Sequence, residues 1–289
     1  MSRATLTLHP SALPFTEVLG RYRMQLSLTL LFLGILYSHT VASMVLKWYR
    51  DPNYSHGFIV PLVSGYALYR QAGALKGAAA RPENRGLLLV ILGLFVFTAA
   101  RLGAESFTMG VSLLIVLAGL VISLFGREVF RAAAFPIGYL FMMVPLPYTL
   151  YDSIAFPLKL LVTQGAVAFL KVIGVVVWRE GNIIMFPDSV FEVADACSGI
   201  RSLMSLIALS AALAYFFQNT LPRRLAVVLS AVPIAVFANW LRVVATGILA
   251  QFWGARAAEG LFHDFAGITV FGLATAMLIA VGFMGGRRR

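Results

Sequence analysis

The sequence predicts an all-α polytopic membrane protein with about eight transmembrane helices. Of its 289 residues, 60% are hydrophobic and 12% are charged, and the mean hydropathy is +0.86. A soluble domain carries roughly a quarter charged residues. The charged residues are missing from long apolar blocks, and several of these blocks reach the ~20 residues needed to cross the hydrocarbon core of a bilayer.

The apolar blocks give the order of the spans. They occupy residues 24–46, 57–70, 86–103, 107–126, 132–147, 198–217, 225–250 and 263–284. Arg21 and Arg23 precede a first block that is longer than the apolar part of a secretory signal peptide, so we read it as a span. No internal repeat or low-complexity linker separates the blocks, and we expect one domain over residues 1–289.

A ninth apolar segment, residues 154–178, is interrupted by Pro157, Lys159 and Lys171. We expect it to form a helix that lies on, or dips into, the outer interface. If it crossed the membrane, the spans after it would invert, and the C-terminal arginines would face outward against the usual distribution of basic residues.

A small outer-face β-hairpin is predicted before the sixth span. Residues 183–186 and 190–193 favour strands, and they flank the turn-forming sequence Pro187-Asp188-Ser189. This hairpin leads directly into Cys197.

The formal net charge of +11 reflects membrane topology rather than nucleic-acid binding. No polar segment carries the stripe of basic and aromatic residues that a nucleic-acid surface requires. With the N-terminus inside, the basic residues collect on the inner loops, as the positive-inside rule expects. They are Arg3, Arg21, Arg23, Arg70, Lys76, Arg81, Arg85, Arg127, Arg131, Arg223, Arg224 and Arg287, Arg288 and Arg289. The chain is therefore predicted to lie in the bacterial inner membrane, with both termini cytoplasmic because the span count is even.

Cys197 is the only cysteine, which excludes an intramolecular disulfide or a cysteine-based metal cluster. It lies at or just before a helix N-terminus on the outer side, where free amide donors and the helix dipole stabilise a thiolate. Arg201, four residues later on the same face, adds to this effect, and burial in lipid acts against it. A lone cysteine can also be a small buried hydrophobe, but the flanking Asp195, Ser198 and Arg201 are unlike a lipid-facing packing site.

Arg242 lies inside an apolar helix, and Asn239 is three residues earlier on the same face. An intramembrane arginine is costly unless it is paired or faces water, so it is a candidate functional residue. A snorkelling arginine at a helix end is the structural alternative, but the apolar run continues for about two turns beyond Arg242.

His263 begins the last span and is suited to proton transfer near neutral pH. Asp264 either orients it or caps the helix. On its own, His263 could equally be an interfacial histidine, and His56, in the loop after the first span, could be structural or substrate-binding. The histidines lack the spacing of metal ligands, and we expect no metal and no cofactor.

The cysteine, arginine and histidine segments converge by topology at the outer ends of three spans. A cysteine nucleophile needs a proton donor or base and a positive group for the tetrahedral oxyanion, and these residues supply that set.

These segments resemble the exosortase/archaeosortase family of membrane cysteine transpeptidases. The motifs that carry the resemblance are Ala194-Asp195-Ala196-Cys197-Ser198-Gly199-Ile200-Arg201-Ser202-Leu203, Asn239-Trp240-Leu241-Arg242, His263 to Gly267 and Ser55-His56-Gly57. They occur in order over most of the chain. The position two before the cysteine is usually Glu in the family, whereas here it is Asp195.

The resemblance implies an enzyme that recognises exported proteins with a C-terminal sorting signal: a Pro-Glu-Pro-type motif, a transmembrane helix and basic residues. It implies that Cys197 attacks a carbonyl near that motif from the periplasmic face, forming a thioester. Arg242 stabilises the oxyanion, and His263 donates a proton to the leaving amine and later activates the acceptor. Asp195, Ser198, Arg201, Asn239 and His56 are the expected supporting or substrate-binding residues.

Two other functions remain open from the sequence. One is a non-proteolytic permease or polymerase of exopolysaccharide synthesis or export, although such proteins place ionisable groups near the bilayer midplane, often in repeated halves. The other is a serine hydrolase that uses Ser198, which lacks the Gly-x-Ser-x-Gly context.

Overall fold

The computed structural model describes residues 13–187, 189–193, 199–253 and 261–284. The chain divides into two compact units, residues 1–145 and 146–289, and each is described by itself. The prediction of one domain stays a prediction.

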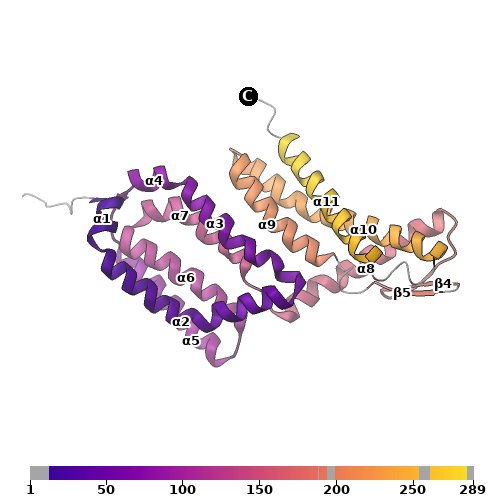
Figure 1. Cartoon of the computed structure of the whole chain (residues 1–289), viewed down its shortest axis with the longest axis horizontal. Helices are drawn as coiled ribbons and strands as arrows, with labels where there is room; N and C mark the ends of the chain where they lie inside the picture. The colour runs from indigo at the N-terminus through magenta and orange to yellow at the C-terminus, as the bar shows by residue number, and fades with distance from the viewer. Residues whose placement is uncertain (1–12, 188, 194–198, 254–260, 285–289) are drawn as a thin grey trace, which may run out of the picture. The chain divides into compact units, whose positions relative to one another are not determined.

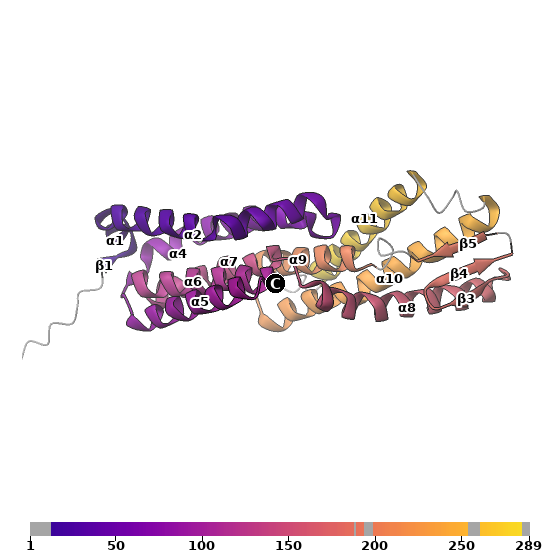
Figure 2. The same cartoon turned by 90° about the horizontal axis from the view of Figure 1, so that it is seen from below.

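The longer helices of unit 1 lie side by side, and successive ones run in opposite directions (Figures 1 and 2). Its elements are β1 (Leu13–Pro14), α1 (Phe15–Arg21), α2 (Arg23–Arg50), η1 (Pro52–Phe58), α3 (Ile59–Arg70), α4 (Ala72–Gly77), β2 (Ala79–Ala80), α5 (Asn84–Leu102), α6 (Ser106–Phe125), α7 (Arg127–Tyr139) and η2 (Leu140–Met143). β1 pairs antiparallel with β2, so the segment before α2 lies beside the segment after α4.

Contacts at the two ends of unit 1 confirm the alternation. At one end, the Arg81 amide donates to the Phe125 carbonyl at 3.1 Å, which joins the start of α5 to the end of α6. At the other end, the Trp48 indole N–H donates to the Met143 carbonyl at 2.9 Å, which joins the end of α2 to η2. The α5–α6 hairpin is close because a Cβ on Gly86 would collide with the Ser123 backbone, and one on Gly119 would lie 2.7 Å from the Val90 nitrogen.

Unit 2 comprises four long helices and a three-stranded sheet. They are α8 (Tyr148–Val172), β3 (Trp178–Glu180), β4 (Ile183–Phe186), β5 (Ser189–Glu192), α9 (Ile200–Phe217), α10 (Leu221–Trp253) and α11 (Leu261–Met284). The strand order is β3-β4-β5, with β4 and β5 antiparallel and Met185 opposite Val190. The predicted hairpin is confirmed, and β3 is an additional strand.

The segment predicted to lie at the interface forms α8, which runs parallel to α10 (Figure 2). Leu158 packs against the α10 cluster that contains Ile234, and the Phe169 ring lies 5.3 Å from that of Trp240. Further along both helices, a Cβ on Gly247 would contact Leu170 at 2.9 Å.

α8 is also long and apolar enough to cross a membrane, and its predicted interfacial position stays a prediction. The residues that argued against a span are accommodated by packing. Lys159 is buried, Pro157 lies inside the helix, and the Lys171 ammonium lies 5.2 Å from the centre of the Trp178 ring.

The protein is an all-α polytopic membrane protein, and the described residues contain seven candidate spans: α2, α5, α6, α8, α9, α10 and α11. The predicted spans at 57–70 and 132–147 form the shorter helices α3 and α7, which η1 and η2 extend. Because the predicted position of both termini rested on an even span count, it stays a prediction.

Candidate functional site

The candidate site is built on one turn of α10 in unit 2. Asn239 and Arg242 are three residues apart and therefore share a helix face. Asn239 is buried, with 3% of its surface exposed, and Arg242 is partly buried. α10 continues for 11 residues beyond Arg242 to Trp253, so this arginine does not lie at a helix end. The alternative, an arginine at a helix end whose side chain reaches the interface, is therefore not supported.

α9 begins against this turn. Gly199 precedes the helix in a left-handed conformation with φ of +78°, and its carbonyl accepts the Leu203 amide at 2.8 Å. A Cβ on Gly199 would lie 2.8 Å from Cγ and 2.9 Å from Nδ2 of Asn239. Glycine is thus required here both by the backbone conformation and by the close approach of α10.

α11 contacts the same turn of α10 at Arg242. A Cβ on Gly267 would lie 3.4 Å from Nη2 and 3.6 Å from Cζ of Arg242, so this part of α11 lies against the guanidinium group. His263 precedes Gly267 by four residues within α11, which is about one turn, or 6 Å along the helix axis. The histidine and glycine therefore occupy the same face of α11.

The chain before α9 is also anchored in unit 2. The Val193 amide donates to the Asn182 carbonyl at 3.0 Å, and Val193 is fully buried. Val193 belongs to a core cluster with Ile184 of the sheet, Leu170 of α8 and Val243 of α10. The segment 194–198 therefore joins two fixed points, Val193 and Gly199.

Several predicted site residues fall on parts of the chain that are not described. Asp195, Cys197 and Ser198 lie outside the described residues, as do the side chains of His263 and Asp264. Arg201 lies in the first turn of α9 and is partly buried. The described parts of the cysteine, asparagine–arginine and histidine segments all meet at residues 239–242. Gly199 and Gly267, which make these contacts, have no functional side chain, and neither was given a role from the sequence.

His56 lies in η1 of unit 1, where it has a structural partner. Its Nε2 is 3.2 Å from the Met142 carbonyl, so it links η1 to η2. Burial lowers the pKa of His56 below its ordinary value, and the carbonyls of Met142 and Asn53 oppose part of the shift. A Cβ on Gly57 would lie 2.5 Å from the Trp48 indole, which explains the glycine after the histidine. A role of His56 in substrate binding stays a prediction.

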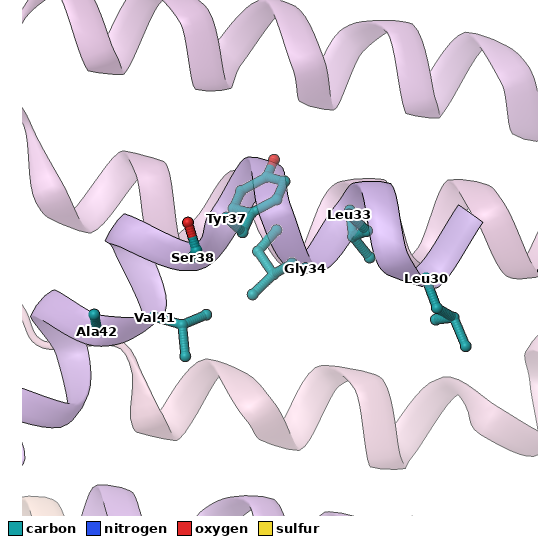
Figure 3. Close-up of a pocket in the computed structure, with 8 residues that line it drawn as sticks. Leu30, Leu33, Gly34, Tyr37, Ser38, Val41 and Ala42 are labelled. Atoms are coloured by element: carbon teal, nitrogen blue, oxygen red, sulfur yellow. The ribbon is translucent and has the colours of Figure 1, made fainter. Parts of the chain in front are cut away.

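Unit 1 also has an apolar groove along α2, with a volume of about 440 Å³ (Figure 3). The small residues Gly34, Ser38 and Ala42 lie along it, and Leu113 of α6 also lines it. The hydroxyl of Tyr37 is bonded to Ser112 Oγ at 3.0 Å. The described residues that line the groove include no charged side chain.

In the part of the chain that the structure describes, no three His, Cys, Asp or Glu side chains are grouped closely enough to hold a metal ion. The geometry of unit 2 instead gathers an arginine, an amide and two helix starts around one turn.

Comparison with known proteins gives one match. The family model for transmembrane exosortases matches residues 48–280, which is most of the chain and includes all four motifs. No curated protein and no solved structure matches the chain.

Proposed function

The chain belongs to the transmembrane exosortase family, and on that premise we propose that it is a cysteine transpeptidase or endopeptidase with Cys197 as its nucleophile. Its substrates are exported proteins that carry a C-terminal sorting signal of the Pro-Glu-Pro type, followed by a transmembrane helix and basic residues. It cleaves them at the outer face of the inner membrane.

The observation that carries this proposal is the meeting of Gly199 and Gly267 with one turn of α10. Gly199 contacts Asn239, Gly267 contacts Arg242, and these two α10 residues are three positions apart. Cys197 precedes Gly199 by two residues in the sequence, and two residues of chain span at most about 7 Å. His263 is one helical turn from Gly267. The nucleophile, the cation and the proton carrier thus belong to segments that share a site.

The proposed reaction begins when the Cys197 thiolate attacks the carbonyl carbon of the scissile peptide bond. The carbonyl oxygen becomes an oxyanion, which the guanidinium group of Arg242 stabilises. The C–N bond then breaks, and His263 donates a proton to the leaving amine while the acyl group stays on the sulfur as a thioester. The neutral imidazole next removes a proton from the acceptor, an amine or water, which attacks the thioester and releases the thiolate.

The charge pattern of unit 2 supports an outer location for this site. Arg223 and Arg224 lie in the first turn of α10, and Asn239 follows Arg224 by 15 residues, which is about 22 Å along the helix axis. The Gln218 amide donates to the Gly282 carbonyl at 2.8 Å, so the end of α11 that leads into Arg287, Arg288 and Arg289 lies at the basic end too. Basic residues favour the cytoplasmic side, which supports a periplasmic location for the Cys197 segment.

The test is processing of a tagged substrate, consisting of a soluble reporter, a Pro-Glu-Pro motif, a transmembrane helix and a basic tail, in membranes that contain each variant. We expect Cys197→Ser and Arg242→Gln to stop cleavage, and Ser198→Ala to retain it. Mass spectrometry of the wild-type protein mixed with substrate should detect an acyl adduct on Cys197. Full processing by Cys197→Ser excludes the cysteine mechanism, and loss of processing by Ser198→Ala alone would favour a serine hydrolase.

A further inference from the structure

The basic end of unit 1 contains an apolar cavity of about 290 Å³ that the proposed reaction does not use. It opens between the α1–α2 junction, the segment around β2 and the end of α6. The lining residues are Val18, Tyr22, Leu26, Ala80, Pro82, Ser123, Leu124 and Phe125. Ligand pockets usually measure about 300–1,000 Å³, so this cavity holds part of a molecule, such as a segment of an acyl chain.

Arginines adjoin the lining residues of the cavity in the sequence. Arg21 and Arg23 flank the lining residue Tyr22, Arg81 precedes Pro82, and Arg127 follows Phe125 by two residues. All four arginines are exposed. Glu83 pairs with Arg127 at 3.0 Å and offsets its charge, which leaves Arg21, Arg23 and Arg81 as the positive charges of this region.

The rim is also held in place by backbone contacts rather than by the cavity's contents. The Arg81 amide donates to the Phe125 carbonyl, and the Phe15 amide donates to the Ala78 carbonyl at 3.3 Å. The Phe15 and Phe125 rings lie 5.0 Å apart and close one side of the space. The cavity therefore exists as a preformed space beside fixed positive charges.

We propose that this cavity binds an anionic phospholipid, with part of an acyl chain among the lining residues and the phosphate at the arginine rim. A soluble anion leaves the apolar lining unfilled, and a zwitterionic lipid does not match the net positive charge. Clusters of basic residues at the cytoplasmic end of membrane helices bind anionic headgroups in this way. This inference is independent of the proposed peptidase activity.

The test is native mass spectrometry of the full-length protein released from micelles containing equal amounts of phosphatidylglycerol and phosphatidylcholine with identical chains. We expect several-fold preference for phosphatidylglycerol. Arg21→Gln combined with Arg23→Gln should reduce that binding about fivefold per arginine. The matched control is Arg101→Gln, an exposed arginine at the opposite end of unit 1, which should leave it unchanged.

Ser123→Leu enlarges a lining side chain while keeping the arginines, and it should weaken phosphatidylglycerol binding. Soluble glycerol phosphate should not compete, because it has no chain to occupy the apolar space. Equal binding of the two lipids, or equal losses in Arg101→Gln and in the rim variant, overturns the proposal. Retained phosphatidylglycerol binding in Ser123→Leu overturns the placement of the acyl chain.

Discussion

Replacing Gly199 by alanine tests whether the start of α9 is fixed against α10. The new Cβ would lie 2.8 Å from Asn239 Cγ, closer than real Cβ contacts, and the backbone would have to keep a φ of +78°. The two penalties are separable, because Gly174 in the same unit has a φ of +87°, and a Cβ added there would meet no atom within 4 Å. Gly174→Ala is therefore the matched control.

The expected magnitudes follow from these two penalties. An L-residue with a Cβ in the left-handed region costs roughly 1–2 kcal/mol, and both variants incur it. Overpacking a buried position costs typically about 1–3 kcal/mol, and only Gly199→Ala incurs that. We expect Gly199→Ala to lower the free energy of unfolding by about 2–5 kcal/mol in total, against about 1–2 kcal/mol for Gly174→Ala.

The assay is equilibrium unfolding in mixed micelles, followed by circular dichroism, with Asn239→Gly added to each alanine variant. Removing the Asn239 side chain relieves the collision at residue 199 but does nothing at residue 174. The two mutations should therefore couple favourably by about 0.5–3 kcal/mol in the Gly199 pair and by nothing in the Gly174 pair. Equal stability of the two single variants, or zero coupling in the Gly199 pair, refutes the contact.

Three further outcomes are expected from the described contacts. Gly267→Ala should retain substrate processing because its Cβ meets Arg242 at an ordinary distance, whereas Gly267→Leu should displace the guanidinium and reduce processing about 100-fold. Glu105 caps α6, and although burial acts to raise its pKa, hydrogen bonds from Thr108 and Phe107 hold the pKa below its ordinary value. Its carboxylate therefore stabilises the fold above pH 4.5, and Glu105→Gln should lower stability by about 1 kcal/mol at pH 7 and by progressively less as the pH falls below 4.5, as thermal unfolding would measure. The lowered pKa of His56 means that the unfolded chain binds the extra proton first, so stability should fall as pH drops below 6.5, and His56→Asn should flatten that part of the unfolding profile.

The long helices α2, α5 and α6 of unit 1 were predictable because long apolar runs between basic or turn-forming residues indicate them. Arg21 and Arg23 mark the start of α2, and the helix continues to Arg50, four residues beyond the predicted end. The segment of α8 was also predicted as a helix, but its lysines were treated as interruptions of the apolar run. Lys159 is buried among helices, and the length of the apolar run alone would have favoured a span. A polar residue inside an apolar segment, such as Lys159, therefore indicates burial in protein. Only the residues that pack against the helix distinguish a spanning helix from an interfacial one.

The site was predictable only as far as polar residues in apolar surroundings reveal it. Asn239 and Arg242 were identified because an amide and a guanidinium are costly within a span unless the protein uses them. Gly199 and Gly267 were not, since a glycine in a membrane helix is common and its sequence neighbours do not say which helix approaches it. The structure assigns each glycine a different α10 neighbour, Asn239 and Arg242 respectively. Each glycine has no side chain, and therefore lets a polar group of α10 lie close to the backbone of a segment that contains a candidate catalytic residue.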